Sequence, residues 1–183
     1  MNQMCKALLL IDIQNDYFSG GKSELVVPEK ALQVAEMVLK KFRDAGLPVI
    51  HVQHINTRAG APFFLPDTEG CRIHERLTPL YGESVVVKHA PNSFYNTNLN
   101  TIIKEKRIAE LVVCGMMTHM CVDTTVRAAK DYGTPITLLA DGCATKDLSF
   151  NNTKLPADTV QKVFLAGLHG MFANIIIGSE FHL

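Results

Sequence analysis

The sequence has no excess charge of either sign, since its 183 residues include 18 Lys and Arg against 18 Asp and Glu. No basic block occurs along it, so nothing would attract a phosphate backbone or an anionic lipid surface. Long apolar runs are also missing. The run from Ala7 to Ile11 meets Asp12 at once, which makes it too short for a signal-peptide core or a membrane span. These absences argue against nucleic-acid and membrane partners and predict a soluble, cytoplasmic protein.

Paired cysteines and nucleotide-binding glycine motifs are absent as well. The five cysteines are an odd number and include no C-x-x-C pair, so neither a disulfide framework nor a zinc knuckle is expected. No G-x-G-x-x-G follows an apolar run and no G-x-x-x-x-G-K-[ST] occurs, which leaves dinucleotide or nucleoside triphosphate use without support. We therefore expect a protein without a cofactor.

What the sequence does contain is an alternation of apolar runs with segments of helical period. With 47% hydrophobic residues, the chain can bury the core of one domain spanning residues 1–183. Alternation of this kind is typical of βαβ units, so it predicts an α/β fold with a mainly parallel, six-stranded sheet. The expected strands are 7–11, 49–53, 84–88, 110–115, 135–140 and 175–177. The expected helices are 28–46, 99–103, 121–133 and 160–171.

Residues 55–82 show neither period and contain several glycines and prolines together with Phe63, Phe64 and Tyr81. Irregular segments of this length inside a compact domain are uncommon and tend to be lids or substrate loops. A packed surface excursion is the alternative.

Three chemically capable residues stand where predicted strands end. Asp12 and Lys88 close the first and third strands, and Cys121 follows the fourth strand at the start of a helix. In open parallel sheets the ligand crevice lies beyond the carboxyl ends of the strands. A helix start favours thiolate over thiol, a carboxylate could take the thiol proton, and a lysine would keep that carboxylate ionised. Together they predict acyl transfer, although each residue alone could be a cap, an edge lysine or a core cysteine.

Six short sequence blocks then resemble a known family. They are residues 12–18 (DIQNDYF), 87–89 (VKH), 93–94 (SF), 115–122 (GMMTHMCV), 124–129 (TTVRAA) and 141–145 (DGCAT). These blocks are similar to the signature blocks of the isochorismatase-like cysteine hydrolase superfamily, which includes nicotinamidases and N-carbamoylsarcosine amidohydrolases. The resemblance covers nearly the whole chain except the 55–82 loop and the C-terminal end.

The resemblance implies a Rossmann-like, doubly wound, three-layer α/β/α sandwich in which Asp12, Lys88 and Cys121 form a catalytic triad. It also implies a cis peptide between Met116 and Met117. The backbone N–H groups of Met117 and Cys121 would then form the oxyanion hole. Similar proteins are usually homo-oligomers that act on a small-molecule substrate.

The resemblance also points to the residues around the substrate. The expected pocket residues are Gln14, Tyr17, Phe18, Phe63 and His54. Similar nicotinamidases bind a metal through an Asp-x-His pair after the second strand, but residues 54–56 here are His-Ile-Asn. His54 and His74 remain as candidate ligands, and because zinc sites need three or four convergent ligands, a metal-free site is expected.

The activity expected from these residues is cysteine-dependent hydrolysis of a small amide, imide or ureido C–N bond through a thioester. One alternative is isochorismatase-type hydrolysis of a vinyl ether, which does not depend on the cysteine. Another is a thiol protein that undergoes redox chemistry or binds a ligand without turnover. A metal-dependent nicotinamidase is the last alternative.

Overall fold

The computed structural model describes residues 5–183, and its centre is a six-stranded sheet in which all neighbouring strands are parallel. The strand order is β3-β2-β1-β4-β5-β8. The strands are β1 Cys5–Ile11, β2 Val49–His54, β3 Ser84–Lys88, β4 Ile108–Met116, β5 Ile136–Ala144 and β8 Asn174–Ile176. The predicted six-stranded, parallel sheet is confirmed.

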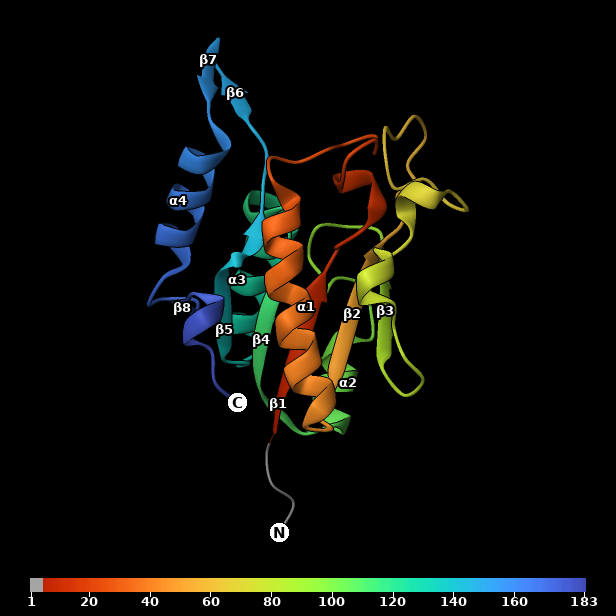
Figure 1. The fold of residues 1–183 in the computed structure, drawn as a ribbon, viewed down its shortest axis with the longest axis vertical. Coiled ribbons are helices and arrows are strands. Elements are labelled where there is room, and N and C mark those ends of the chain that lie inside the picture. Colours follow the sequence, from red (N-terminus) through yellow and green to blue (C-terminus); the bar gives the residue numbers. More distant parts are fainter. Residues whose placement is uncertain (1–4) are drawn as a thin grey trace.

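Helices cover both faces of this sheet, as Figure 1 shows. They are α1 Pro28–Asp44, α2 Leu99–Glu105, α3 Asp123–Asp131 and α4 Ala157–Leu168. Helix α1 packs its buried side chains on one face, and α2 and α3 pack theirs on the other face. The expected three-layer α/β/α sandwich is therefore confirmed.

The central strand β1 shows why its buried part, from Ala7 to Ile11, is apolar without interruption. Ala7 and Leu9 face one hydrophobic cluster, whereas Leu8 and Leu10 face the other. All four are at most 2% exposed. Successive side chains of a strand point to opposite faces, so a strand covered on both sides must be apolar at every position.

The predicted fifth strand and last helix differ most from the observed elements. The fifth strand extends to Ala144 rather than Ala140, because a bulge lets the chain rejoin the sheet after residue 140: Val113 pairs with Leu138, but Gly115 pairs with Cys143. The last helix ends at Leu168 rather than 171. Within its predicted apolar stripe, Val163 and Met171 are 62% and 66% exposed.

A short antiparallel hairpin projects from the body between β5 and α4 (Figure 1). Its strands are β6 Leu148–Phe150 and β7 Thr153–Leu155, and no element was predicted here. Asn151 and Asn152 form its tip with φ angles of 48° and 59°. Asparagine tolerates this left-handed region better than most residues, which suits a tight hairpin turn.

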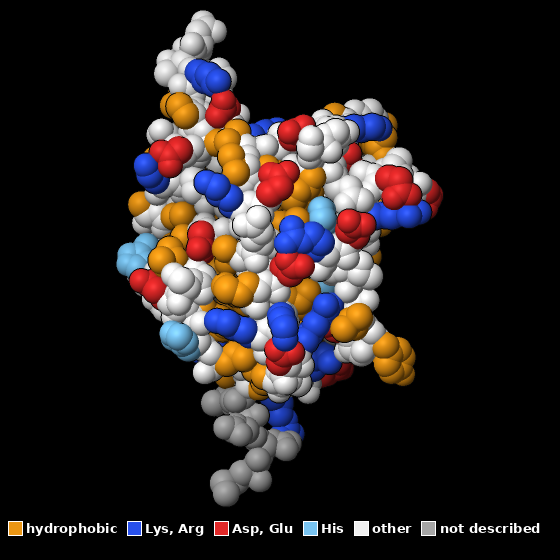
Figure 2. Space-filling view, viewed as in Figure 1, with side chains coloured by type: hydrophobic (Ala, Val, Ile, Leu, Met, Phe, Trp, Pro, Cys, Tyr) orange, Lys and Arg blue, Asp and Glu red, His pale blue; other side chains and the backbone are white. Residues whose placement is uncertain are grey.

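The surface is mixed in charge. On the face shown in Figure 2, basic and acidic side chains are interspersed over the body. Within residues 5–183, none of the helices combines the length and apolarity needed to cross a bilayer.

Candidate active site

The three residues at the strand ends come together, and the strand order explains how. Strand β2 lies between β3, which carries Lys88, and β1, which ends just before Asp12. Two inter-strand spacings are about 10 Å, so only a long side chain on β3 can reach a short carboxylate beyond β1. The Lys88 Nζ atom lies 2.7 Å from Asp12 Oδ2.

The Lys88 ammonium group is surrounded by acceptors. Besides Asp12, it contacts Cys121 Sγ at 3.2 Å, His54 Nδ1 at 3.0 Å and the Ala90 carbonyl at 3.0 Å. Burial opposes the charge, but Asp12 and Cys121 outweigh it and raise the pKa of Lys88 above its ordinary value. Lys88 therefore stays protonated and fixes the geometry of its neighbours.

Asp12 and Cys121 are buried beside this cation. Asp12 is 0% and Cys121 is 4% exposed. Burial, reinforced by the Asp12 charge, raises the pKa of the Cys121 thiol, and Lys88 offsets only part of that rise. The thiol is therefore protonated at neutral pH until a base takes its proton. Asp12 Oδ1 is a buried acceptor that makes no hydrogen bond within residues 5–183.

His54 is the fourth member of the cluster. It ends β2 and pairs directly with Lys88 in the β2–β3 register, so the lysine side chain must pass over it. Burial, followed by the charge of Lys88, lowers the pKa of His54 to about 4. The ring is thus neutral at pH 7. Because its Nδ1 accepts from the ammonium, its Nε2 carries the proton.

Three of the same side chains lie close enough together to be considered as metal ligands. Asp12, His54 and Cys121 each offer a ligand atom, and these atoms lie within 4.8 Å of one another. Lys88 Nζ already lies 2.7 to 3.2 Å from all three side chains. An ammonium held there repels a divalent cation and uses the same lone pairs. The donor set does not fit a metal ion.

Cys121 lies on an unusual helical turn. Residues Thr118–Val122 form one π-helical turn that runs directly into α3. The helix thus begins at Thr118, earlier than predicted, with Cys121 in its first turn. We call residues 118–122 the cysteine turn. The peptide bond between Met116 and Met117, just before it, is cis, at the position the resemblance implies. The roles of the Met117 and Cys121 N–H groups as an oxyanion hole stay a prediction.

The predicted pocket residues differ in their surroundings. Gln14 is fully buried, and its amide bonds to the His54 N–H and carbonyl and to the Cys71 carbonyl, at 2.7 to 2.9 Å. It therefore connects strand ends and has no group left for a ligand. Tyr17 packs against Phe63 at 5.8 Å, and its pKa is raised by burial and by the nearby Cys121 and Asp12 charges. Tyr17 therefore lies near Asp12 and Cys121, and the role of Tyr17 and Phe63 as pocket residues stays a prediction.

Phe18 lies elsewhere. It is 7% exposed and packs on His74, with ring centroids 4.4 Å apart. The His74 Nδ1 in turn accepts a hydrogen bond from the Arg76 N–H at 3.3 Å. The structure thus places His74 in a packing role next to Phe18 and outside the Lys88 cluster.

Asp16 is a residue whose importance sequence reasoning missed. Its buried carboxylate accepts from the Phe64 N–H at 2.6 Å and from the Lys22 N–H at 3.1 Å. A Cβ at Gly70 would overlap this carboxylate, so only glycine fits there. Asp16 thereby fixes the 55–82 loop beside the site. The signal available in the sequence was a second carboxylate, besides Asp12, within the 12–18 block.

These features define an α/β protein with a carboxylate, an ammonium and a thiol in contact at the carboxyl edge of a parallel sheet. The family model of the isochorismatase domain matches residues 6–169. The chain belongs to the isochorismatase family, which confirms the resemblance seen in the sequence.

Individual relatives agree with this assignment. The uncharacterised isochorismatase family protein YddQ of Bacillus subtilis is 51% identical over 172 residues, which cover 94% of this chain and 96% of YddQ. A crystal structure of an isochorismatase from Pseudomonas putida superposes with a TM-score of 0.91 at 36% identity, covering 97% of this chain and 90% of the other. A streptothricin hydrolase of Streptomyces noursei is 34% identical over 145 residues, 78% of this chain and 51% of that protein.

Proposed function

We propose that this protein is a cysteine hydrolase that cleaves the C–N bond of a small amide, imide or ureido compound. The observation that carries the proposal is the contact of one buried ammonium, Lys88 Nζ, with both Asp12 Oδ2 and Cys121 Sγ. This arrangement joins a base, an orienting cation and a nucleophile. The similarity to a streptothricin hydrolase supports hydrolysis as the reaction class.

In the first half of the reaction, Asp12 accepts the Cys121 proton and the sulfur attacks the substrate carbonyl carbon. Backbone N–H groups of Met117 and Cys121 stabilise the tetrahedral oxygen. Protonated Asp12 then gives its proton to the leaving nitrogen as the C–N bond breaks, which leaves a thioester on Cys121.

In the second half, Asp12 takes a proton from water, and the resulting hydroxide attacks the thioester carbon. The C–S bond breaks, the carboxylic acid leaves and Cys121 recovers its proton. Throughout, Lys88 compensates the charge that moves between Asp12 and Cys121, because both lie within hydrogen-bonding distance of its ammonium. The half-buried ring of Phe63, which packs against the buried Tyr17, favours a flat organic substrate.

The test measures ammonia release from nicotinamide, maleamate, N-carbamoyl compounds and biuret, and ring opening to the amic acid for cyclic imides, which release no ammonia when one C–N bond is cleaved. Wild type, Cys121→Ser and Cys121→Ala are compared after treatment with a chelator. We expect both variants to lose at least about 10³-fold in kcat, and the chelator to change nothing. Mass spectrometry of the wild type with a slow substrate should show an acyl adduct on Cys121.

Cys5→Ser is the matched control, because Cys5 is a partly exposed cysteine on the same sheet at the opposite end of β1. It should retain full activity. Turnover that persists in Cys121→Ala would exclude the thioester route and favour ether hydrolysis. Loss of turnover on chelation would contradict the metal-free site.

A further inference from the structure

We propose that Gln161 of α4 is a positioning residue that holds the cysteine turn in its reactive geometry. The inference rests on the proposed function in one respect, that Cys121 is the nucleophile. Gln161 lies outside every sequence block that resembles the family, and it does not contact the Lys88 cluster. Its side chain instead connects the β5 bulge with the first residue of the cysteine turn.

The first half of the argument concerns the bulge in β5. Between the Val113–Leu138 and Gly115–Cys143 pairs, β4 advances two residues while β5 advances five. A bulge of this size leaves carbonyl groups outside the ladder, and such groups need other donors. Gln161 Nε2 supplies them: it donates to the carbonyls of Ala140 and Cys143 at 3.1 and 3.2 Å.

These two bonds fix the orientation of the Gln161 amide. Both of its N–H groups are used, and a flipped amide would place its oxygen against two carbonyl oxygens. The amide oxygen must therefore point the other way. There it accepts a hydrogen bond from the Thr118 hydroxyl, with the two oxygens 2.6 Å apart.

Thr118, held by this hydrogen bond, fixes the start of the turn that carries the nucleophile. It is fully buried, it begins the cysteine turn, and its hydroxyl also lies 3.2 Å from the Ala144 carbonyl. Three residues later the turn presents Cys121 Sγ to Lys88 Nζ at 3.2 Å. Reactive geometries tolerate errors of only about 0.5 Å, so a turn released at Thr118 would misalign the sulfur.

A purely structural role would be to keep α4 on the body. Helix α4 has other anchors for that, since Ala157, Val160 and Leu168 are all buried. Loss of the Gln161 bonds is therefore expected to change the reactivity of Cys121 more than the stability of the fold.

The test uses Gln161→Met, which keeps the length of the side chain but removes all three hydrogen bonds, and Thr118→Val, which removes only the hydroxyl. The alkylation rate of Cys121 by iodoacetamide is measured against pH by mass spectrometry, together with kcat and KM. We expect alkylation at pH 8 to fall at least about five-fold, and kcat to fall about ten-fold with KM changed less than about two-fold. The double variant should be no slower than the worse single variant.

Lys162→Ala is the control on the same helix, because the Lys162 side chain is 74% exposed and, among residues 5–183, pairs only with Asp158 at the surface. It should behave as wild type. If Gln161→Met and Thr118→Val both alkylate at the rate of Lys162→Ala, the proposal is wrong. Because alkylation reports Cys121 directly, this outcome is distinct from a substrate panel that shows no hydrolysis, which would overturn the proposed function alone.

Discussion

The ammonium of Lys88 has three protons and four acceptors within 3.2 Å. Two of the four acceptors must therefore share one ammonium proton. The ammonium can then strengthen its bond to whichever of Asp12 and Cys121 carries the negative charge during the reaction. Among the four acceptors, His54 differs in its response to pH. It is the acceptor that becomes a cation at moderately acid pH, because burial and Lys88 lower its pKa to about 4.

This assignment predicts an acid limb in the pH profile. Above about pH 4, His54 is neutral and accepts from Lys88; below it, an imidazolium faces the ammonium and repels it. Log kcat/KM should therefore fall as the pH decreases through about 4, and His54→Gln should shift that limb. The exposed His169→Gln serves as a control, and circular dichroism at each pH verifies folding. Identical limbs in wild type and His54→Gln would contradict the assignment.

At the residue level, the sequence was sufficient to predict which strand ends carry chemistry but not which residues touch. Asp12, Lys88 and Cys121 each follow an apolar run, so the rule that ligands bind beyond strand carboxyl ends finds them. The contact of His54 with Lys88 depends on β2 lying between β3 and β1, and strand order is a property of the whole sheet. The sequence therefore suggested His54 for the pocket or a metal, without its actual partner.

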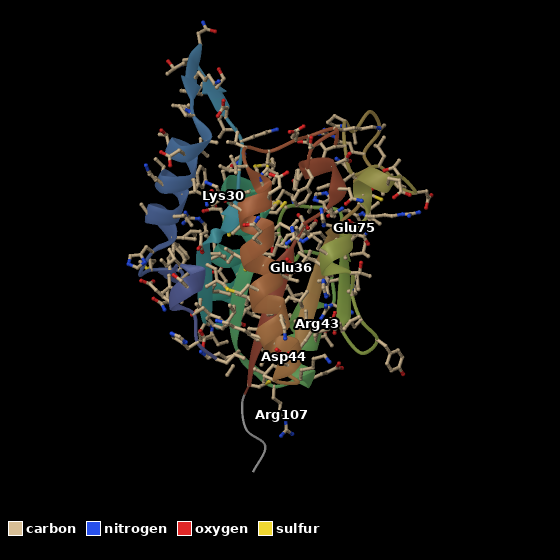
Figure 3. The ribbon with its side chains drawn as sticks, in the orientation of Figure 1. Lys30, Glu36, Arg43, Asp44, Glu75 and Arg107 are labelled. Atoms are coloured by element: carbon tan, nitrogen blue, oxygen red, sulfur yellow. The ribbon has the colours of Figure 1, made fainter. Side chains whose placement is uncertain are left out.

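On the scale of elements, one ion-pair cluster connects α1, β2 and the start of β3. Glu83 accepts from Arg43 at 2.7 and 2.9 Å, from the Leu80 N–H at 2.8 Å, and contacts His51 Nε2 at 2.8 Å. Burial opposes the charge, but these hydrogen bonds lower the pKa of Glu83 to about 2. Figure 3 labels Arg43 and its neighbour Asp44 near the lower end of α1.

The cluster predicts how stability depends on acid. The unfolded chain binds a proton at Glu83 near its ordinary pKa of 4.5, whereas the folded protein does so only near 2. This contribution is complete above about pH 4.5 and is lost as the pH falls through about 2. Glu83→Gln should lower the free energy of unfolding by roughly 2 kcal/mol at pH 7. In this variant the free energy of unfolding should also decrease less, as the pH falls, than it does in the wild type. Urea unfolding at pH 7, 5 and 3 measures both effects.

Asp44→Asn is the matched control, because Asp44 pairs with Lys40 in a bridge whose side chains are 63% and 75% exposed. Exposed pairs contribute little, so this variant should unfold as wild type does. A Glu83→Gln variant with unchanged acid sensitivity would show that the cluster does not contribute as described.

The elements that the sequence predicted are those with a strong periodic signal. Strand β3 was predicted with its observed bounds, and α1 within two residues of its end. The cysteine turn and the β6–β7 hairpin were missed for different reasons. A π turn has the composition of an ordinary helix start, and each hairpin strand has only three residues, too few to establish a period of two.

On the scale of the molecule, the site draws on residues far apart in the chain, from Asp12 to Cys121. Strand β1 ends just before Asp12 and strand β4 leads to Cys121, and both of these central strands are paired on each side. Lys88 differs from them. It ends β3, a five-residue strand at the edge of the sheet that pairs only with β2 and exposes 44% of Val85 and 42% of Val87.

An edge strand detaches at a smaller cost than the strands inside a sheet, so β3, like β8 at the other edge, should open before the central strands β1 and β4. When β3 detaches, the ammonium leaves with it, while the rest of the sheet stays intact. Amide hydrogens of β3 should accordingly exchange with deuterium faster than those of β1. Activity should also disappear at a lower urea concentration than the circular dichroism signal, whereas coincident transitions would contradict this. Because the lysine that organises the chemistry ends an edge strand, catalysis should be lost before the sheet as a whole unfolds.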